Sequence, residues 1–244
     1  KLTEDDGSQY GLCLRNDNNQ AGYYNLIYDN GGYIINDDKT KSGMDDPKTV
    51  EAMEMVEGWI KDGVLPPIET MSENGEDVLL ESGKVAMVPQ GSWMIAAFRD
   101  NEYTAENCDC VELPKSATTG RRASLYNGLG WAAAANTEHP EEAWQLIEYL
   151  GSKEAQEKQA ELGVTMSAYT GTSEAWAKSA NFNLQAYINM MNHMEIRPYS
   201  RSTVTWENKN SEILKSVYSG DKTMADACKE MAEQMNESLS EEQQ

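Results

Sequence analysis

The stretch that decides the fold is Leu79-Leu80-Glu81-Ser82-Gly83-Lys84-Val85-Ala86-Met87-Val88-Pro89-Gln90-Gly91-Ser92-Trp93. Its pattern predicts the end of a helix, a turn at 83–84, a buried strand over 85–88, and a second turn before a new helix. The strand is a continuous apolar run, which is typical of a strand covered on both faces by helices. Open α/β sheets bind ligands beyond the carboxyl ends of their strands, so Gly91 and Trp93 are expected beside a ligand crevice.

Trp93 is the first candidate for a binding residue. The glycine two positions earlier lets a ligand approach the backbone, and the indole offers a flat apolar face. A tryptophan that ends an ordinary βα unit inside the core is the alternative, and this stretch alone leaves both open.

The same stretch resembles a known signature, Phe-x-x-Gly-Lys-x-Ala-Met…Gly-x-Trp. The signature belongs to the sugar-type extracellular solute-binding proteins of ABC importers, the maltose-binding-protein-like family. The residues that fit it are Lys84, Ala86, Met87, Gly91 and Trp93. Leu80 stands where the family usually has Phe. The resemblance implies that Trp93 stacks on a sugar ring.

The charge balance excludes several classes of partner. The chain has 41 acidic and 20 basic residues and a formal net charge of −21. Such a chain repels phosphate backbones and anionic lipid, so we expect no nucleic-acid partner. No apolar run reaches the roughly 18–20 residues that cross a bilayer, and residues 1–7 have no apolar core of a secretion signal.

The cysteines and histidines do not predict a metal centre or a catalytic centre. The cysteines are Cys13, Cys108, Cys110 and Cys228. Cys108 and Cys110 have one residue between them and no second ligand pair nearby, which is not a zinc spacing. Free thiols are the favoured interpretation, and a disulfide between any two stays open. The two histidines are far apart and match no triad, so neither a metal nor a cofactor is expected.

The N-terminal part predicts a strand over 8–14, a polar loop at 16–20 and a second strand over 33–36. The loop is not a calcium site, because the alternating acidic ligands and the terminal Glu are absent. The resemblance implies that the pair Tyr23-Tyr24 lies where relatives put a ligand-facing side chain, which makes Tyr24 a candidate. Tyrosines at a helix start also pack with only the hydroxyl in water, and that alternative stays open.

Helices are expected wherever a cap precedes an apolar stripe. Asp45-Asp46-Pro47 begins one that ends at 62–63, and His139-Pro140 begins another that ends at Gly151. Thr223, with Asp226 three residues later, begins the last helix in the manner of a capping box. A strand over 111–114 is also expected.

The stretch 124–131 is rich in small residues, which suggests that something approaches its backbone closely. The resemblance implies that this segment crosses between two lobes beneath the ligand. Tyr126, Asn127 and Gly128 are therefore binding candidates. A tightly packed sheet with helices pressed on its glycines is the alternative.

A proline-containing segment, 197–201, precedes a long helix over 204–218. The resemblance implies that it closes one side of the site, which makes Tyr199 and Arg201 candidates, since Arg carries a fork of donors for hydroxyls or a carboxylate. Trp206 is a further candidate, with packing between lobes as the alternative.

The resemblance covers 10–239 and implies an α/β fold of the type II periplasmic-binding-protein kind. We expect mostly the C-terminal lobe, together with the crossing strand and helices of the first lobe. Residues 1–127 are assigned to the second lobe, 128–192 to the crossing segment and first-lobe helices, and 193–244 to the return into the second lobe. Most of the first lobe is expected to be missing, so 132–190 should expose apolar surface or associate with another chain.

The leading hypothesis is therefore the extracytoplasmic binding component of an ABC importer, either a cell-surface lipoprotein or a periplasmic protein. It would hold a mono- or oligosaccharide between two hinged lobes and work with the permease subunits of the transporter. No enzyme activity is expected. The alternatives are a carbohydrate hydrolase with two carboxylates and a sensor-linked recognition domain on the same fold.

Overall fold

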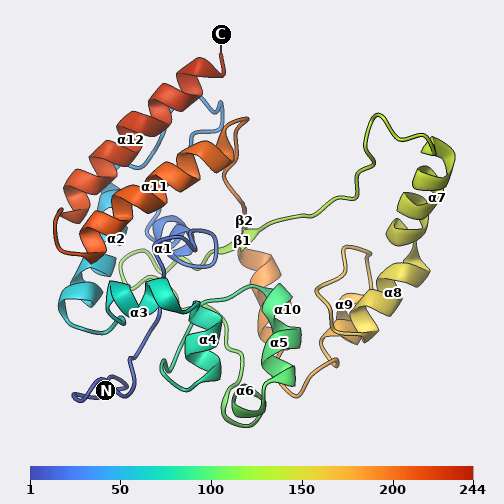
Figure 1. Ribbon diagram of the computed structural model, residues 1–244, viewed down its shortest axis with the longest axis horizontal. Helices are drawn as coiled ribbons and strands as arrows, with labels where there is room; N and C mark the ends of the chain where they lie inside the picture. Colours follow the sequence, from blue (N-terminus) through green and yellow to red (C-terminus); the bar gives the residue numbers. More distant parts are fainter. Residues whose placement is uncertain (244) are drawn as a thin grey trace. The chain divides into compact units, whose positions relative to one another are not determined.

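The computed structural model describes residues 1–243, and these form two compact units (Figure 1). Unit 1 contains Lys1–Gln90, Leu113–Tyr126 and the segment from His193 onward. Unit 2 contains Gly91–Glu112 and Asn127–Asn192. Unit 1 is therefore assembled from three separate stretches of the sequence.

Unit 1 combines a helical core with a small parallel sheet. Its helices are α1 (Tyr23–Asp29), α2 (Pro47–Lys61), α3 (Ile68–Glu73), α4 (Glu76–Glu81), α11 (Thr203–Tyr218) and α12 (Met224–Glu241). Strands β1 (Ser124–Tyr126) and β2 (Met194–Ile196) pair in parallel, with Ser124 opposite Met194 and Tyr126 opposite Ile196. The sheet thus joins two stretches that are distant in the sequence.

Unit 2 is helical. Its elements are η1 (Ser92–Met94), α5 (Ile95–Asp100), α6 (Glu102–Asn107), α7 (Pro140–Gly151), α8 (Lys153–Glu161), α9 (Ser173–Trp176), α10 (Gln185–Met190) and, at its end, η2 (Met191–His193). Trp176 is fully buried and packs edge-on against Tyr187, with the ring centroids 5.6 Å apart.

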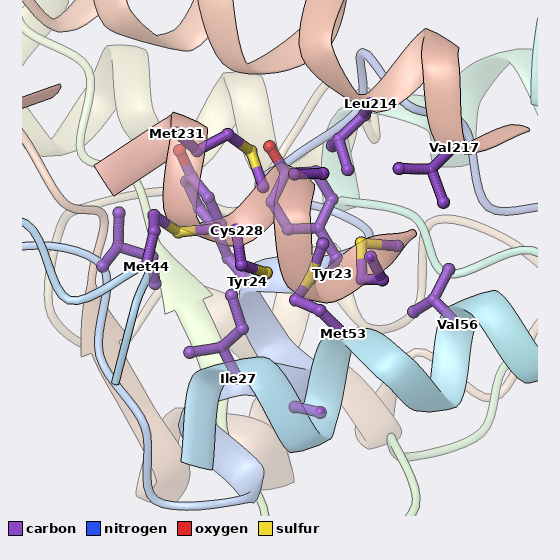
Figure 2. Packing of buried hydrophobic residues seen from close by; sticks show 14 of the residues in the cluster. Tyr23, Tyr24, Ile27, Met44, Met53, Val56, Leu214, Val217, Cys228 and Met231 are labelled. Carbon is purple, nitrogen blue, oxygen red and sulfur yellow. The ribbon is translucent and has the colours of Figure 1, made fainter. Parts of the chain in front are cut away.

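The core of unit 1 lies where α12 packs on α11 and on α2, and where α2 packs on α1. Figure 2 shows the side chains that fill it, including Tyr23, Tyr24 and Ile27 from α1, Met53 and Val56 from α2, Leu214 and Val217 from α11, and Cys228 and Met231 from α12. Full burial of a large aliphatic side chain contributes about 1.5–3 kcal/mol. The core residues from these four helices therefore make a large contribution to the stability of the unit.

Local capping explains where the long helices begin. Pro47 occupies the first turn of α2, and the Asp46 carboxylate accepts a 2.9 Å hydrogen bond from the amide of Lys48. At α12 the Thr223 hydroxyl accepts from the amide of Asp226 at 3.2 Å and donates to its carboxylate at 2.7 Å. Both helix starts confirm the sequence predictions.

The buried strand predicted over 85–88 is wrong. Val85 makes only an isolated parallel bridge with Tyr10, supported by a 2.9 Å hydrogen bond from the amide of Ala86 to the carbonyl of Tyr10. Met87 is 49% exposed, so helices do not cover both faces of the run. The reason is that the segment around Tyr10 is the one neighbouring strand-like backbone that bonds to 85–88 in the described residues, while the amide of Val85 donates back to Leu79 at the end of α4. One short neighbour does not make a sheet.

Three other predicted strands are also wrong. Over 8–14 the chain makes only the isolated bridge at Tyr10. In place of a strand over 33–36 there is an isolated antiparallel bridge between Ile35 and Ser42. The residues over 111–114 form no strand, and Val111 is almost fully exposed. An apolar run becomes a strand only when a partner backbone lies within hydrogen-bonding distance.

The two units differ from the predicted segments at 91–112 and at Asn127, which begins the second stretch of unit 2. Residues 91–112 group with unit 2, whereas the sequence placed them with the rest of 1–127. The hydroxyls of Ser92 and Thr165 lie 3.3 Å apart, and Arg99 Nη1 donates to the carbonyl of Leu162 at 3.3 Å. The assignment of the units to lobes stays a prediction. Gln244, the last residue of the predicted segment 193–244, lies outside the described residues.

Exposed apolar side chains occur in more than one part of 132–190. Helix α7 has no buried residue, and its Trp144 and Leu146 are exposed. Farther along, Trp176 and Leu184 are buried. Exposed apolar side chains therefore occur on α7 and again at Leu162, Val164 and Tyr169.

Candidate functional site

A polar pocket of about 490 Å³ lies on unit 1, between the loop before α1 and residues 207–215 of α11. Its lining residues are Asp17, Asn18, Asn19, Gln20, Arg197, Glu207, Asn208, Ser211, Glu212 and Lys215. All of them carry a polar side chain, and none is aromatic. We call this feature the polar pocket.

The loop wall of the polar pocket is held in a tight turn. The amide of Gly22 donates to the carbonyl of Asn18 at 2.9 Å, and the side-chain oxygen of Asn18 accepts from the amide of Ala21 at 3.3 Å. A Cβ on Gly22 would lie 2.7 Å from that carbonyl oxygen and 2.7 Å from Leu14 Cδ1. The turn therefore requires glycine at this position.

A second set of contacts, centred on Glu76, anchors the same loop. The Asn18 side-chain amide donates to Glu76 Oε1, and Gln90 Nε2 donates to the same oxygen at 3.1 Å. Arg15 Nη1 lies 3.6 Å from the other oxygen of Glu76. The amide of Asn18 is thus oriented by α4 and by the segment that follows it.

The helix wall is built around an ion pair. Arg197 Nη2 and Glu207 Oε2 are 2.5 Å apart, with the two side chains 28% and 10% exposed. Tyr24 donates its hydroxyl proton to the other oxygen of Glu207 at 3.4 Å. Burial raises the pKa of Tyr24 well above its ordinary value, so the hydroxyl remains a donor at neutral pH.

The carboxylates of the polar pocket all have cationic partners. Asp17 is 2.6 Å from Arg15, Glu207 pairs with Arg197, and Glu212 is 2.6 Å from Lys215. A ligand in the pocket therefore meets both donors and acceptors, and each carboxylate of the lining has a cation within 4 Å. This chemistry suits a neutral ligand with many hydroxyl groups.

Two of the candidates from the sequence are core residues. Tyr24 and Trp206 are fully buried in unit 1, and Trp206 donates from Nε1 to the hydroxyl of Ser200 at 2.9 Å. This placement corrects their assignment as ligand contacts, because a side chain without accessible surface presents no face to a ligand. Both instead support the helix wall of the polar pocket, Tyr24 through Glu207 and Trp206 as its neighbour in α11.

Trp93 is exposed, as a ligand platform requires. It lies in η1 of unit 2, and 46% of its surface is accessible. A Cβ on Gly91 would fall 2.0 Å from ring carbon Cζ3 of Trp93. The space beside the glycine backbone is therefore occupied by the indole itself, one face of which lies against Gly91.

The crossing-segment candidates are divided between the units. Tyr126 ends β1 in unit 1 and is exposed, and its carbonyl accepts from the amide of Arg197 at 3.0 Å. Asn127 and Gly128 begin the exposed stretch of unit 2. Within the stretch 124–131, only Ser124–Tyr126 is a strand.

Tyr199 and Arg201 do not line the polar pocket. Lys39 Nζ lies 3.2 Å from the centre of the Tyr199 ring, and its hydrogen bond and charge lower the pKa of that hydroxyl. Arg201 is held at Glu242, whose carboxylate accepts from its amide at 3.0 Å. These contacts connect the segment 197–201 to Lys39 and to Glu242 within unit 1.

The sequence interpretation missed Asn18, Gln20, Glu207 and Asn208 as candidate binding residues. The unbroken polar run 16–20 was a signal, but it was treated only as a rejected calcium loop. Within residues 1–243, no three or more His, Cys, Asp or Glu side chains gather in a way that could hold a metal ion. All four cysteines are free, and burial raises the pKa of Cys13 to about 12.

Solved structures share this fold. The chain is similar to an ABC substrate-binding protein of Listeria monocytogenes in complex with cycloalternan (TM-score 0.83, 18% identity, 98% of this chain and 61% of that chain). It is also similar to a solute-binding protein of Thermotoga lettingae bound with alpha-D-tagatose (TM-score 0.80, 23% identity, 97% of this chain and 61% of that chain). A third similar structure is that of a maltose/maltodextrin-binding domain of Bdellovibrio bacteriovorus bound to maltotriose (TM-score 0.78, 18% identity, 98% of this chain and 63% of that chain). The chain thus spans 61–63% of the length of these three proteins.

These likenesses confirm the predicted fold class, that of type II periplasmic sugar-binding proteins. No curated protein sequence matches the chain. Among the described residues, no helix combines the length and the apolar composition needed to cross a membrane. Residues 5–188 match the family described as bacterial extracellular solute-binding protein. Because this match covers most of the sequence, the chain belongs to that family.

Proposed function

We propose that the chain is the binding component of a sugar ABC importer and that it captures a mono- or oligosaccharide without altering it. The observation that carries this proposal is the polar pocket, whose charges are internally paired and whose amides and hydroxyl can hydrogen-bond sugar hydroxyls. The exposed indole of Trp93 supplies an apolar face on which a sugar ring stacks.

The family and the solved structures with this fold are substrate-binding proteins rather than enzymes. The three relatives described above carry cycloalternan, tagatose and maltotriose, which are neutral carbohydrates. Their ligands support the proposed ligand class. We infer further that the protein works outside the cytoplasm, as a cell-surface lipoprotein or in the periplasm, and delivers its ligand to permease subunits.

Calorimetric titration against a panel of neutral mono- and oligosaccharides tests the proposal. Asn208→Ala removes a pocket side chain that is exposed and makes no contact required for folding, and it should weaken binding about 2- to 10-fold, the worth of one neutral hydrogen bond. Lys209→Ala is the matched control, because Lys209 is the next residue on α11 and does not line the pocket. Equal affinity in both variants would remove the polar pocket from the site.

Trp93→Ala tests the stacking contribution separately. Because the ring is half exposed, its removal should leave the melting temperature of the unliganded protein nearly unchanged and abolish the stabilisation by ligand. Chromatography of the glycans after incubation should return them intact. Cleaved products would favour a hydrolase instead.

A further inference from the structure

Three asparagines of the chain are followed directly by glycine, namely Asn30, Asn74 and Asn127. In such a pair the amide nitrogen of the glycine can attack the side-chain carbon Cγ of the asparagine, because glycine has no side chain to shield that nitrogen. The attack forms a cyclic imide and expels ammonia. Water then opens the ring at either carbonyl, which leaves aspartate or isoaspartate. The net change is the consumption of water and the release of ammonia, and no oxidant or enzyme takes part.

The rate of this reaction depends on local structure, because the backbone must bend until the glycine nitrogen reaches Cγ of the asparagine. Hydrogen bonds that anchor the pair or the backbone on either side of it must break first. An anchored pair therefore reacts only during local opening of the fold, which is rare in buried or helical segments. The hydrogen bonds and the burial of the three pairs thus indicate which of them reacts fastest.

The pair Asn30-Gly31 has both of its reacting groups engaged. Asn30 is buried, and its Nδ2 donates to the carbonyl of Lys48 at 2.8 Å and to Glu51 Oε2 at 3.0 Å. The amide of Gly31 donates to the carbonyl of Tyr28 at 3.0 Å. Attack at this pair therefore requires the end of α1 to open.

The pair Asn74-Gly75 is fixed between two helices. Asn74 follows α3, and its amide donates to the carbonyl of Thr70 at 3.1 Å. Gly75 precedes α4, and its carbonyl accepts from the amide of Leu79 at 3.0 Å. The carboxylate of Asp77 also lies beside Gly75, where its negative charge disfavours the deprotonated amide that attacks. The backbone on both sides of this pair is thus held at a helix end.

The glycine of the pair Asn127-Gly128 has no such anchor. The strand pairing stops at Tyr126, whose carbonyl accepts from the amide of Arg197, and within residues 1–243 the amide of Gly128 donates to no backbone acceptor. Both residues of the pair are exposed, and Figure 1 shows them in an extended connection that leads to α7. We infer that Asn127 is a site of spontaneous deamidation, with water as the only co-reactant.

The modification alters the chain where it passes from unit 1 to unit 2, since Tyr126 ends a stretch of unit 1 and Asn127 begins one of unit 2. Aspartate at this position replaces a neutral amide with a carboxylate. Isoaspartate also carries the main chain through its side-chain carbon, which lengthens the backbone at this point. Deamidation therefore changes both the charge and the length of the covalent connection between the units.

Peptide mapping of the full 244-residue chain tests this inference. The protein is kept folded at mildly alkaline pH, and each peptide is scored over time for the mass gain of about 1 Da that separates an amide from a carboxylic acid. Position 127 should react at least about tenfold faster than positions 30 and 74, which must wait for local opening. In concentrated urea the three rates should become similar. Equal rates in the folded protein, or a difference that persists in urea, would overturn the inference.

Variants identify the reacting groups. Gly128→Ala places a methyl group beside the attacking nitrogen, and Asn127→Gln moves the amide carbon one bond farther away, so each should lower the release of ammonia by the folded protein several-fold. Asn74→Gln is the matched control and should leave that release unchanged. Ammonia release that persists in the first two variants, or that is lost in the control, would contradict deamidation at 127. No sugar takes part, so failure here leaves the proposed function untouched.

Discussion

Glu207 and Arg197 form an ion pair that is mostly withdrawn from solvent, with Glu207 Oε2 and Arg197 Nη2 2.5 Å apart. The pair links α11 to the segment that follows β2 and forms one wall of the polar pocket. The stability of that wall therefore depends on both partners being present.

Arg197→Met is expected to destabilise the protein by about 1–3 kcal/mol, because it leaves a nearly buried carboxylate without its cation; the partial exposure of Arg197 keeps the loss below that of a fully buried pair. Adding Glu207→Gln should recover most of the loss. Urea denaturation of the two single variants and the double variant measures the coupling. Lys215→Met is the control, since its pair with Glu212 is exposed and should be worth less than about 1 kcal/mol.

Gly22→Ala should reshape the loop wall of the polar pocket. The added methyl group would fall 2.7 Å from the carbonyl oxygen of Asn18, which is backbone and cannot rotate away. We expect sugar affinity to fall about tenfold or more and stability to fall by about 1–3 kcal/mol, as for overpacking. Calorimetry and urea denaturation measure both.

The same substitution at Gly58 is the matched control. Gly58 lies inside α2, and no atom lies within 4 Å of the place that an added methyl group would take. Gly58→Ala should therefore raise stability by about 0.5–1 kcal/mol and leave affinity unchanged. Loss of affinity in both variants would mean that the effect of Gly22→Ala does not arise in the pocket.

Asp29 makes the stability of unit 1 depend on pH. Burial raises the pKa of this carboxyl to about 6, although the amide of Ala123 donates to it and Arg121 and Arg122 act in the opposite direction. Since the folded pKa lies above the unfolded value of about 4, the folded state holds the proton more tightly, and its stability falls as pH rises from about 4 to about 6.

Asp29→Asn removes that charge and keeps the acceptor for Ala123. At pH 7.5 the variant should be more stable than the parent by about 1–3 kcal/mol, and at pH 4 the difference should shrink toward zero. Denaturation curves of the variant and the parent at pH 7.5 and at pH 4 measure this difference in stability. Equal destabilisation at both pH values would show that the loss does not arise from the charge, because the Asp29 carboxyl is protonated in the folded state at pH 4.

Glu242 acts in the opposite direction at low pH. Burial opposes the shift, but hydrogen bonds from the side chains of Ser202 and Ser200 and from two backbone amides lower its pKa to about 2. The stabilisation is present above the ordinary value of about 4.5 and is lost as pH falls toward 2.

Glu242→Gln should therefore cost about 0.5–1 kcal/mol at pH 7 and nothing below pH 2, a modest figure because the group is largely hydrated. Glu241→Gln, the exposed neighbour, is the control and should change stability little. Thermal melts at pH 7 and pH 2 measure the difference. A loss that persists unchanged at pH 2 would assign the effect to packing rather than to charge.

Helix starts could be predicted because the information is local. Asp46 with Pro47, and Thr223 with Asp226, lie within four residues of the backbone groups that they satisfy. The run over 85–88 has equally clear apolar character, yet it becomes only a bridge at Val85 because a strand depends on a distant partner. No pattern within the run reports that partner.

The candidate site likewise contains residues that a local sequence pattern could predict and residues that it could not. Trp93 was found from a local glycine–tryptophan pattern, and its exposure agrees with the expectation, whereas its part in binding stays a prediction. Tyr24 and Trp206 resemble binding aromatics in sequence, but tertiary packing buries both. Asn18 and Glu207 line one pocket from positions far apart in the sequence, so neither stretch alone marks the site.

The main core of unit 1 combines helices that the ribosome synthesises at widely separated times. Helix α2 ends at Lys61, and α12, which packs on it, does not begin until Met224. At a synthesis rate of roughly 5–20 residues per second, the ribosome needs about 8 to 30 s to supply the missing helix. During that interval α1 and α2 have no finished core to join, so the core of unit 1 is completed only when the last helix has been synthesised.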